Sequence, residues 1–239
     1  MEKKRRFRSR FAAAILAMIF AVGMIAAGPA VRAEAAVKKP ANCRFVQWMN
    51  TQYTKCQIKW DPVSGIDGYE TSWSWTDGKH QKIQSWKAPA NGIYMKVPNN
   101  RVSLFKVRAY KKSGTTKTYS EWSNTVFITP SPTLITWKWS YKNGVPNENF
   151  TWNRVIGTSG YRIYLSMDRK KWVLAKTINK STLLKATITK YNGKNMKQGK
   201  KDEYKYYFRI ISLRKVNGKM VEAPKYSATW CPGYFYFTK

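Results

Sequence analysis

Hydrophobic and polar residues alternate in many short segments of this chain. Residues 57–60 read polar, apolar, polar, apolar, and after a break with two glycines the alternation resumes over residues 69–74. A period of two is typical of strands with one buried face, and the glycines indicate a turn between them. The pattern predicts an all-β chain.

The segment Trp60–Ser74, WDPVSGIDGYETSWS, recurs as WNRVIGTSGYRIYLS at Trp152–Ser166, 92 positions later. Trp, Val, Gly, Gly, Tyr and the final Ser keep their places in both copies. A period near 90 residues is too long for a solenoid unit and is typical of two small domains in tandem. We expect Trp60, Tyr69, Trp152 and Tyr161 to belong to the two cores.

A second block also occurs twice. FKVRAYKKSG, followed by YSEWSN, begins at Phe105, and YYFRIISLRKVNG, followed by KYS, places Phe208 at the matching position, 103 residues later. Together the two blocks resemble the B, C, F and G strands of fibronectin type III domains. The resemblance implies two tandem fibronectin type III-like (immunoglobulin-like) β-sandwiches. It also places Tyr206 at the tyrosine corner, where Ser103 stands in the first repeat.

The expected domains cover residues 36–130 and 131–239, with Thr129–Pro132 as a stiff linker. In the second domain, Ile135, Trp137 and Trp139 alternate in the first strand. The offset between copies grows from 92 to 103, so eleven residues are inserted, and Asn192–Asp202 (NGKNMKQGKKD) predicts a solvated loop. The strands expected in the first domain are residues 42–46, 56–60, 69–75, 82–86, 94–97, 102–110 and 118–128.

Residues 1–35 have the pattern of a signal peptide. A cationic head, MEKKRRFRSR, precedes the uncharged apolar stretch Phe11–Ala27, and Ala33-Glu34-Ala35 has the small-residue spacing of a cleavage site. The long basic head resembles signal peptides of Gram-positive bacteria. An uncleaved membrane anchor is the alternative. We expect a secreted, extracellular protein, associated with a bacterial cell wall, with its mature N-terminus near Ala36.

The charge of the mature chain favours an anionic partner. Removal of residues 1–35 takes away seven of the 44 basic and two of the 12 acidic residues and leaves a net charge of +27. Such a charge could serve general solubility. The more specific explanation is an anionic partner such as teichoic acid, an acidic polysaccharide, lipid headgroups or nucleic acid.

The chemistry of an enzyme is absent from the sequence. His80 is the only histidine, and a lone histidine cannot build a typical zinc site. Asp61 and Asp67 flank the turn of the first repeat, where turn formation explains them more simply than a catalytic carboxylate pair. We therefore predict no catalytic residue, no metal site and no cofactor.

Three cysteines, Cys43, Cys56 and Cys231, belong to the mature chain. Export permits a disulfide between Cys43 and Cys56, and the alternative is two separate buried thiols. The role of Cys231 stays open, because its own repeat offers no second cysteine.

The chain also contains eleven tryptophans, which suggest a second kind of site. Exposed rings could stack on sugar faces, as in carbohydrate-binding modules, or else close the rims of small cores. The tryptophans for which both explanations stay open are Trp48, Trp75, Trp86, Trp122 and Trp172.

The resemblance brings two basic segments of the second domain to one pole. Seven cations gather there, and we call them the basic tip: Arg169, Lys170, Lys171, Lys194, Lys197, Lys200 and Lys201. We expect a non-enzymatic binding, adhesion or spacer protein at a bacterial surface that contacts anionic polymers through this tip. A carbohydrate-binding module and an extracellular nucleic-acid-binding protein are the alternatives. The oligomeric state stays open.

Overall fold

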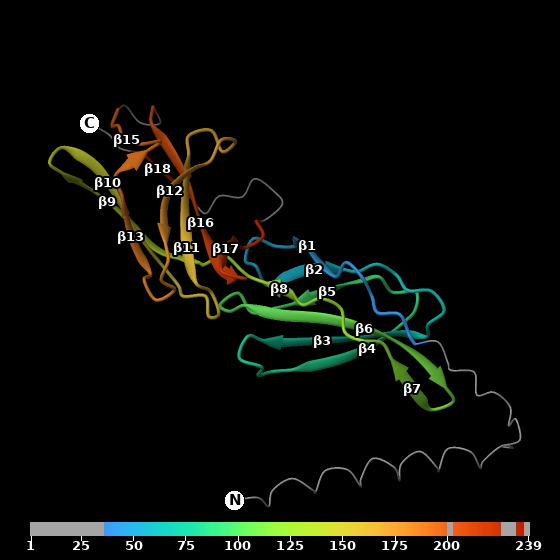
Figure 1. Ribbon diagram of the computed structural model, residues 1–239. Helices are drawn as coiled ribbons and strands as arrows, with labels where there is room; N and C mark the ends of the chain where they lie inside the picture. Colours follow the sequence, from blue (N-terminus) through green and yellow to red (C-terminus); the bar gives the residue numbers. More distant parts are fainter. Residues whose placement is uncertain (1–35, 200–202, 226–232, 237–239) are drawn as a thin grey trace, which may run out of the picture. The chain divides into compact units, whose positions relative to one another are not determined.

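The computed structural model describes residues 36–199, 203–225 and 233–236, and every helix or strand within them is a β-strand (Figure 1). The predicted signal peptide, Cys231, Lys200 and Lys201 lie outside these ranges. In the same ranges no helix has the length and apolar character needed to cross a membrane.

The first half of the described chain forms two antiparallel sheets. One has the strand order β1-β2-β5, and the other has the order β4-β3-β6-β7, with β8 also pairing with β6. The strands are β1 (Arg44–Trp48), β2 (Lys55–Lys59), β3 (Gly68–Trp75), β4 (Lys82–Lys87), β5 (Gly92–Lys96), β6 (Ser103–Ser113), β7 (Thr116–Tyr119) and β8 (Val126–Ile128).

The second half repeats this plan. The sheet β13-β10-β9 faces the sheet β12-β11-β16-β17, with β18 also pairing with β16, and β14 and β15 form a separate ribbon. The strands are β9 (Leu134–Lys142), β10 (Val145–Trp152), β11 (Gly160–Ser166), β12 (Val173–Ile178), β13 (Lys185–Ile188), β14 (Lys190–Tyr191), β15 (Lys194–Asn195), β16 (Lys205–Val216), β17 (Lys219–Glu222) and β18 (Gly233–Tyr236).

Each half has its own apolar core. One buried cluster draws all its residues from 43–128, and the other draws its residues from 150–235. In both clusters the residues come from both sheets of that half, which makes each half a β-sandwich. Two tandem fibronectin type III-like β-sandwiches were predicted from the sequence, and the strand orders confirm this fold class.

The two copies of the repeated stretch make the same side-chain packing and hydrogen-bonding contacts. The rings of Trp60 and Tyr69 pack edge to face with centroids 5.3 Å apart, and those of Trp152 and Tyr161 do the same at 5.3 Å. The Tyr69 hydroxyl accepts the backbone N–H of Val63 at 2.7 Å. These contacts explain why Trp, Val and Tyr recur together.

The second copy has the matching bond. Val155 donates its backbone N–H to the Tyr161 hydroxyl at 3.3 Å, and that hydroxyl donates to the Ser181 carbonyl at 3.2 Å. The glycine before each tyrosine has no room for a side chain. A Cβ at Gly68 would lie 2.2 Å from the Trp86 carbonyl oxygen, and one at Gly160 would lie 2.0 Å from that of Ile178.

The strand predicted over residues 118–128 is wrong as a single strand. It is two strands, β7 and β8, separated by residues 120–125. There Ser120 accepts the backbone N–H of Ala109 at 2.9 Å through its hydroxyl, and Ser123 accepts that of Val107 at 3.1 Å. The serine hydroxyls thus replace the carbonyl acceptors of a continuous strand, while the backbone N–H groups of Ser120 and Ser123 still donate to the carbonyls of Ala109 and Val107.

The inserted segment is also more ordered than predicted. Lys194–Asn195 pairs with Lys190–Tyr191 across a turn at Asn192 and Gly193, both with positive φ. Met196 is 3% exposed and packs in the second core. A solvated loop was therefore the wrong prediction for this part of the insertion, because one buried Met attaches it to the core.

Two further predictions concern the linker and the cysteines. Thr129 and Ser131 are buried, and residues 37–239 form one compact unit, so the domain boundary near residue 130 stays a prediction. A disulfide between Cys43 and Cys56 does not form, because both thiols are free and buried. Cys56 pairs in register with Trp48, whereas Cys43 precedes the opposite end of β1.

Candidate binding surfaces

The basic tip begins in the turn between β11 and β12. Arg169 has a positive φ, and its guanidinium lies 5.3 Å from the centroid of the Tyr207 ring. The Asp168 carboxylate accepts the backbone N–H groups of Lys171 and Lys170, both at 2.8 Å, and these bonds lower the pKa of Asp168. The acid of this turn is therefore engaged by backbone, and the lysine side chains are not neutralised by it.

The other segment of the tip meets the same strand. Lys197 donates its backbone N–H to the Tyr206 hydroxyl at 3.1 Å, the bond expected of a tyrosine corner, and Lys194 is exposed in β15. Tyr206 and Tyr207 are neighbours at the start of β16, so both segments contact the same end of that strand. Successive strand residues point to opposite faces, which places Arg169 and Lys197 on different sides of β16. The tip as a binding site stays a prediction.

A larger group of cations lies on the outer face of the first sandwich, away from its core. Strand register places these residues on one side of the sheet β4-β3-β6-β7. We call them the basic face: Lys87, Lys106, Arg108, Lys112 and Lys117. This face was not predicted from the sequence, although Lys106 and Arg108 alternate with the core residues Phe105 and Val107, which indicates that they lie on the outer side of the strand.

Aromatic rings hold several of these cations in place. Arg108 lies 3.8 Å from the Tyr119 ring centroid and 4.5 Å from that of Trp122. Lys106 lies 4.7 Å from the same Trp122 ring, and Lys117 lies 4.4 Å from the ring of Tyr110. Contacts of this kind orient a cation without cancelling its charge.

One acid lies among the residues of the basic face. Glu70 accepts two bonds from Arg108, at 2.6 and 2.9 Å, and is 6% exposed. Its charge is therefore committed to a single partner. The remaining four cations of the face outnumber the acid and keep their positive charge.

The five tryptophans considered from sequence are not exposed. Trp48 is buried, and Trp75, Trp86, Trp122 and Trp172 are half-buried. Arginines cover two of them, since Arg101 lies 3.6 Å from the Trp75 ring centroid and Arg209 lies 3.4 Å from that of Trp172. None of the five is among the exposed large hydrophobic residues, so these rings are poor candidates for sugar stacking.

The exposed tryptophans belong to β9 instead. Trp137, Trp139 and Tyr141, which we call the aromatic row, are 42%, 48% and 40% exposed. They pair in register with Phe150, Glu148 and Pro146 of β10, so the row is on the side of the hairpin that faces the core. Alternation predicted that side correctly. It could not reveal that β9 is the outer strand of a three-stranded sheet, where rings on the core side are still partly open to solvent. Of the row, only Tyr141 pairs with a β10 residue, Pro146, that lies beyond the span paired with β13 (Figure 1).

Glu148 points to the same side of the hairpin as the aromatic row. The residue is fully buried, yet neither carboxyl oxygen has a hydrogen-bond partner. Its neighbours across the strands are Trp139 and Ile188, which offer no charge. Burial raises the pKa of Glu148 to about 8. A buried carboxyl without a partner is costly to the fold and is a frequent sign of a functional site.

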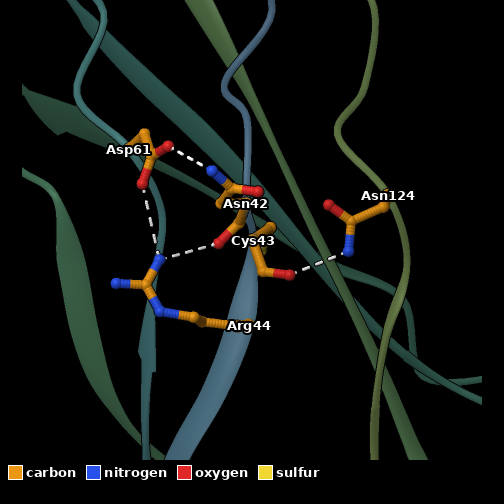
Figure 2. Close-up of a pocket in the computed structure, with 5 residues that line it drawn as sticks. All are labelled: Asn42, Cys43, Arg44, Asp61 and Asn124. Atoms are coloured by element: carbon orange, nitrogen blue, oxygen red, sulfur yellow. Dashed lines mark hydrogen bonds and ion pairs between the residues drawn. The ribbon is translucent and has the colours of Figure 1, made fainter.

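The first sandwich has a shallow depression of about 500 Å³. Its acid, unlike Glu148, has hydrogen-bond partners. Figure 2 shows its lining residues, among which Asp61 bonds to Asn42 and Arg44, and Asn124 donates to the Cys43 carbonyl at 2.8 Å. Burial raises the pKa of the Cys43 thiol to about 11, so this sulfur is no nucleophile near neutral pH. The Asp61 carboxylate and the Asn42 and Asn124 amide nitrogens are therefore engaged within the protein.

Asp67 and His80, also considered from the sequence, have structural roles in turns. Asp67 accepts the backbone N–H of Lys112 at 2.7 Å, and Ser159 accepts that of Lys215 at 3.0 Å at the matching place of the second copy. His80 is exposed beside Trp75 in the β3–β4 hairpin. Among the described residues, no three His, Cys, Asp or Glu side chains gather in a way that could hold a metal ion.

Comparisons with known proteins concern the fold. No family model and no curated protein matches the chain. The FN1–FN3 domains of chicken CNTN1 are 15% identical with a TM-score of 0.33, and the match covers 80% of this chain and 66% of that one. A two-domain fibronectin type III segment of chicken tenascin is 12% identical with a TM-score of 0.38, over 78% and 98% of the two chains. A myokine is 12% identical with a TM-score of 0.34, over 40% and 98%. At these TM-scores the fold assignment depends on the strand orders above.

Proposed function

We propose that this chain is a non-enzymatic, extracellular binding protein that contacts an anionic polymer through its basic face. The observation that carries the proposal is the gathering of five cations and one acid on a single sheet surface. Because Glu70 is taken up by Arg108, an approaching anion meets a surface of one sign.

The spacing of the face suits a polymer better than a small anion. Neighbouring strands are about 4.8 Å apart, and residues two apart on a strand are separated by about 6.8 Å. Such distances are within the Debye length of about 8 Å at physiological salt, so the cations act together on a chain of negative groups. The aromatic contacts lower the entropy cost of ordering Lys106, Arg108 and Lys117 on binding.

The acids elsewhere in the described chain strengthen this argument. Glu222 is bonded to Arg162 at 3.0 Å, and Asp61 is bonded to Arg44 at 3.5 Å. Each of these two carboxylates is paired with an arginine, which reduces the repulsion that it would exert on an anionic ligand. The predicted signal peptide and the net charge of +27 favour secretion to a surface rich in anionic polymer, such as a bacterial cell wall. Within this proposal the basic tip is a second, smaller contact.

The test compares three triple reversals to Glu, each lowering the net charge by six. The face variant replaces Lys87, Lys112 and Lys117 of the basic face. The tip variant replaces Arg169, Lys170 and Lys194 of the basic tip. The control variant replaces Lys38, Lys55 and Lys96, three exposed lysines that belong to neither the basic face nor the basic tip. Circular dichroism and thermal melts establish that each variant is folded.

The mature protein and its variants are applied to immobilised dextran sulfate, with uncharged dextran as the reference matrix, and eluted with NaCl. We expect the face variant to elute at clearly lower salt than the control, since each phosphate-like or sulfate contact contributes to the salt dependence. Equal losses in all three variants would mean that only net charge matters. A larger loss from the tip variant than from the face variant would place the site at the tip.

A further inference from the structure

We propose that the second copy of the repeated turn attaches the second sandwich rigidly to the first, so that the two sandwiches move as one body. The turn is formed by residues 153–159, between β10 and β11, and it meets residues 100–102, which precede β6. This joint is separate from the basic face and does not depend on the function proposed above.

The first attachment at the joint is made by main-chain atoms. Ile156 donates its backbone N–H to the Asn100 carbonyl at 2.8 Å, and the Ile156 carbonyl accepts the N–H of Val102 at 2.8 Å. The two bonds form a parallel β-bridge between Arg101 and Ile156. Val102 is 0% exposed, so water does not compete for its N–H. Because hydrogen bonds have a narrow range of length and direction, the bridge fixes the orientation of the two segments as well as their distance.

Two further attachments join other strands of the sandwiches. At the end of β1, the Trp48 indole donates its N–H to the Pro224 carbonyl, just after β17, at 3.1 Å. The Arg214 guanidinium of β16 lies 3.3 Å from the centroid of the Phe127 ring of β8. Neighbouring domains move relative to one another unless contacts oppose the motion. A single attachment leaves rotation about itself free, whereas three attachments between different strands oppose it.

The linker between the sandwiches lacks the character of a hinge. Residues 129–132 are all buried, and the two prolines among them have fixed φ angles. A hinge is made by a few residues that absorb large changes of φ and ψ. In agreement with a fixed joint, residues 37–239 form one compact unit that contains both sandwiches.

The same glycine has different surroundings in the two copies of the turn. Gly65 and Gly157 are matching positions, and both have a positive φ, of 66° and 85°. A Cβ at Gly157 would lie 2.8 Å from the Thr76 hydroxyl oxygen and 3.2 Å from the Val102 Cβ, both in the first sandwich. A Cβ at Gly65 would have no described atom within 4 Å, its chain neighbours aside. The second copy of the turn is therefore packed against the first sandwich, whereas the first copy is open at this position.

The first experiment uses these glycines for a matched pair of variants of the mature protein. Gly157→Ala and Gly65→Ala both place alanine at a positive φ, so their backbone costs are alike, but only Gly157→Ala also collides with the first sandwich. Hydrogen exchange measured by NMR follows the amides of Val102 and Ile156, which donate in the bridge. We expect both amides to be protected in the wild type and in Gly65→Ala, and to exchange about tenfold faster or more in Gly157→Ala.

The second experiment measures whether the sandwiches share one orientation in solution. Residual dipolar couplings are recorded in a stretched, uncharged polyacrylamide gel, because an anionic medium would bind the strongly cationic protein. We expect the couplings of residues 44–128 and 134–222 to fit a single alignment tensor in the wild type and in Gly65→Ala. Gly157→Ala should require two tensors of different magnitude.

Arg214→Ala loosens the joint in a second way and replaces Gly157→Ala if circular dichroism shows that variant to be unfolded. It removes the contact with Phe127, and Lys215→Ala, at an exposed neighbour on the same strand, is its control. We expect the Ile156 amide to exchange faster in Arg214→Ala than in this control. Two tensors in the wild type would overturn the inference, as would bridge amides that exchange equally fast in the loosened variant and in its matched control.

Discussion

The first strands of the two sandwiches, β1 and β9, have the same place in the fold and very different surfaces. Each is the edge strand beside the one that precedes the repeated turn. β1 has five residues and ends on Trp48, which is 1% exposed, whereas β9 has nine residues and exposes both Trp137 and Trp139. β1 shows that a sandwich of this kind closes with a short edge strand, whereas β9 continues beyond the residues of β10 that pair with β13.

The repeated turn, in contrast to these edge strands, is nearly identical in the two sandwiches. Between its two copies the Trp–Tyr ring distance is the same, and the tyrosine hydroxyl accepts the same backbone N–H. Here each side chain has several partners, so few substitutions are tolerated. The comparison teaches that this chain keeps its core contacts constant and varies an edge. The predictions below test that division, beginning with the largest expected effect.

Trp60→Ala and Trp152→Ala should each destabilise one sandwich by about 3–5 kcal/mol, because both rings are buried and truncation leaves a cavity. Urea unfolding, followed by the fluorescence of the remaining tryptophans, measures the loss. Since the two cores share no residue, each variant should weaken its own half alone, and Trp139→Ala should change stability little. A single transition that shifts by the same amount in both variants would contradict separate cores.

The stability of the second sandwich should fall as pH rises from about 4.5 to about 8. Burial raises the pKa of Glu148 in the folded protein to about 8, so between these values the folded state binds a proton that the unfolded state has lost. The free energy of unfolding then decreases by roughly 1.4 kcal/mol per pH unit and levels off above pH 8.

The control for this slope is Glu148→Gln, which cannot titrate. Thermal melts at pH 5, 6, 7 and 8 should show a smaller decrease of the melting temperature in the variant than in the wild type. Parallel curves would mean that the carboxyl titrates normally in the folded state. No carboxyl is buried in this way on β2, so the first sandwich offers a second reference.

Gly68→Ala and Gly160→Ala should each cost about 1–3 kcal/mol, as is usual when a methyl group is forced into a packed site. In both copies the new Cβ would collide with a carbonyl oxygen of the adjoining strand, β4 or β12. Similar losses of unfolding free energy, measured by denaturant unfolding, would confirm that the same steric contact with a carbonyl oxygen requires glycine in both copies of the turn. Lys138→Ala on the exposed edge strand is the matched control, and it should be nearly neutral.

Tyr→Phe substitutions should have the smallest effect, about 1 kcal/mol, since each removes one hydroxyl and leaves a backbone N–H without its partner. We expect Tyr161→Phe to cost more than Tyr69→Phe, because the Tyr161 hydroxyl also donates to the Ser181 carbonyl. Equal losses in denaturant unfolding would mean that this second bond contributes nothing measurable.

The sequence alone was sufficient for the class of fold and for much of the core. Alternation with a period of two reports which side of a strand faces inward, and a repeated Trp–Val–Gly–Gly–Tyr pattern reports a turn that must be built twice. Both signals are local, since they depend on neighbouring residues and on contacts that each copy makes within itself. The same locality explains the errors at residues 118–128 and at Met196, where a contact with a distant strand decides the outcome.

Only the tertiary structure decided which residues form surfaces. Alternation placed Trp137 and Trp139 on the inward side of β9, and the position of β9 at the edge of its sheet leaves both rings partly exposed. Lys106 and Arg108 join Lys87 and Lys117 in one basic face only because β4 and β7 flank β3 and β6 in the sheet. Exposure and charge clustering depend on which strands lie side by side and where each one ends, and neither property is written in the period of a single strand.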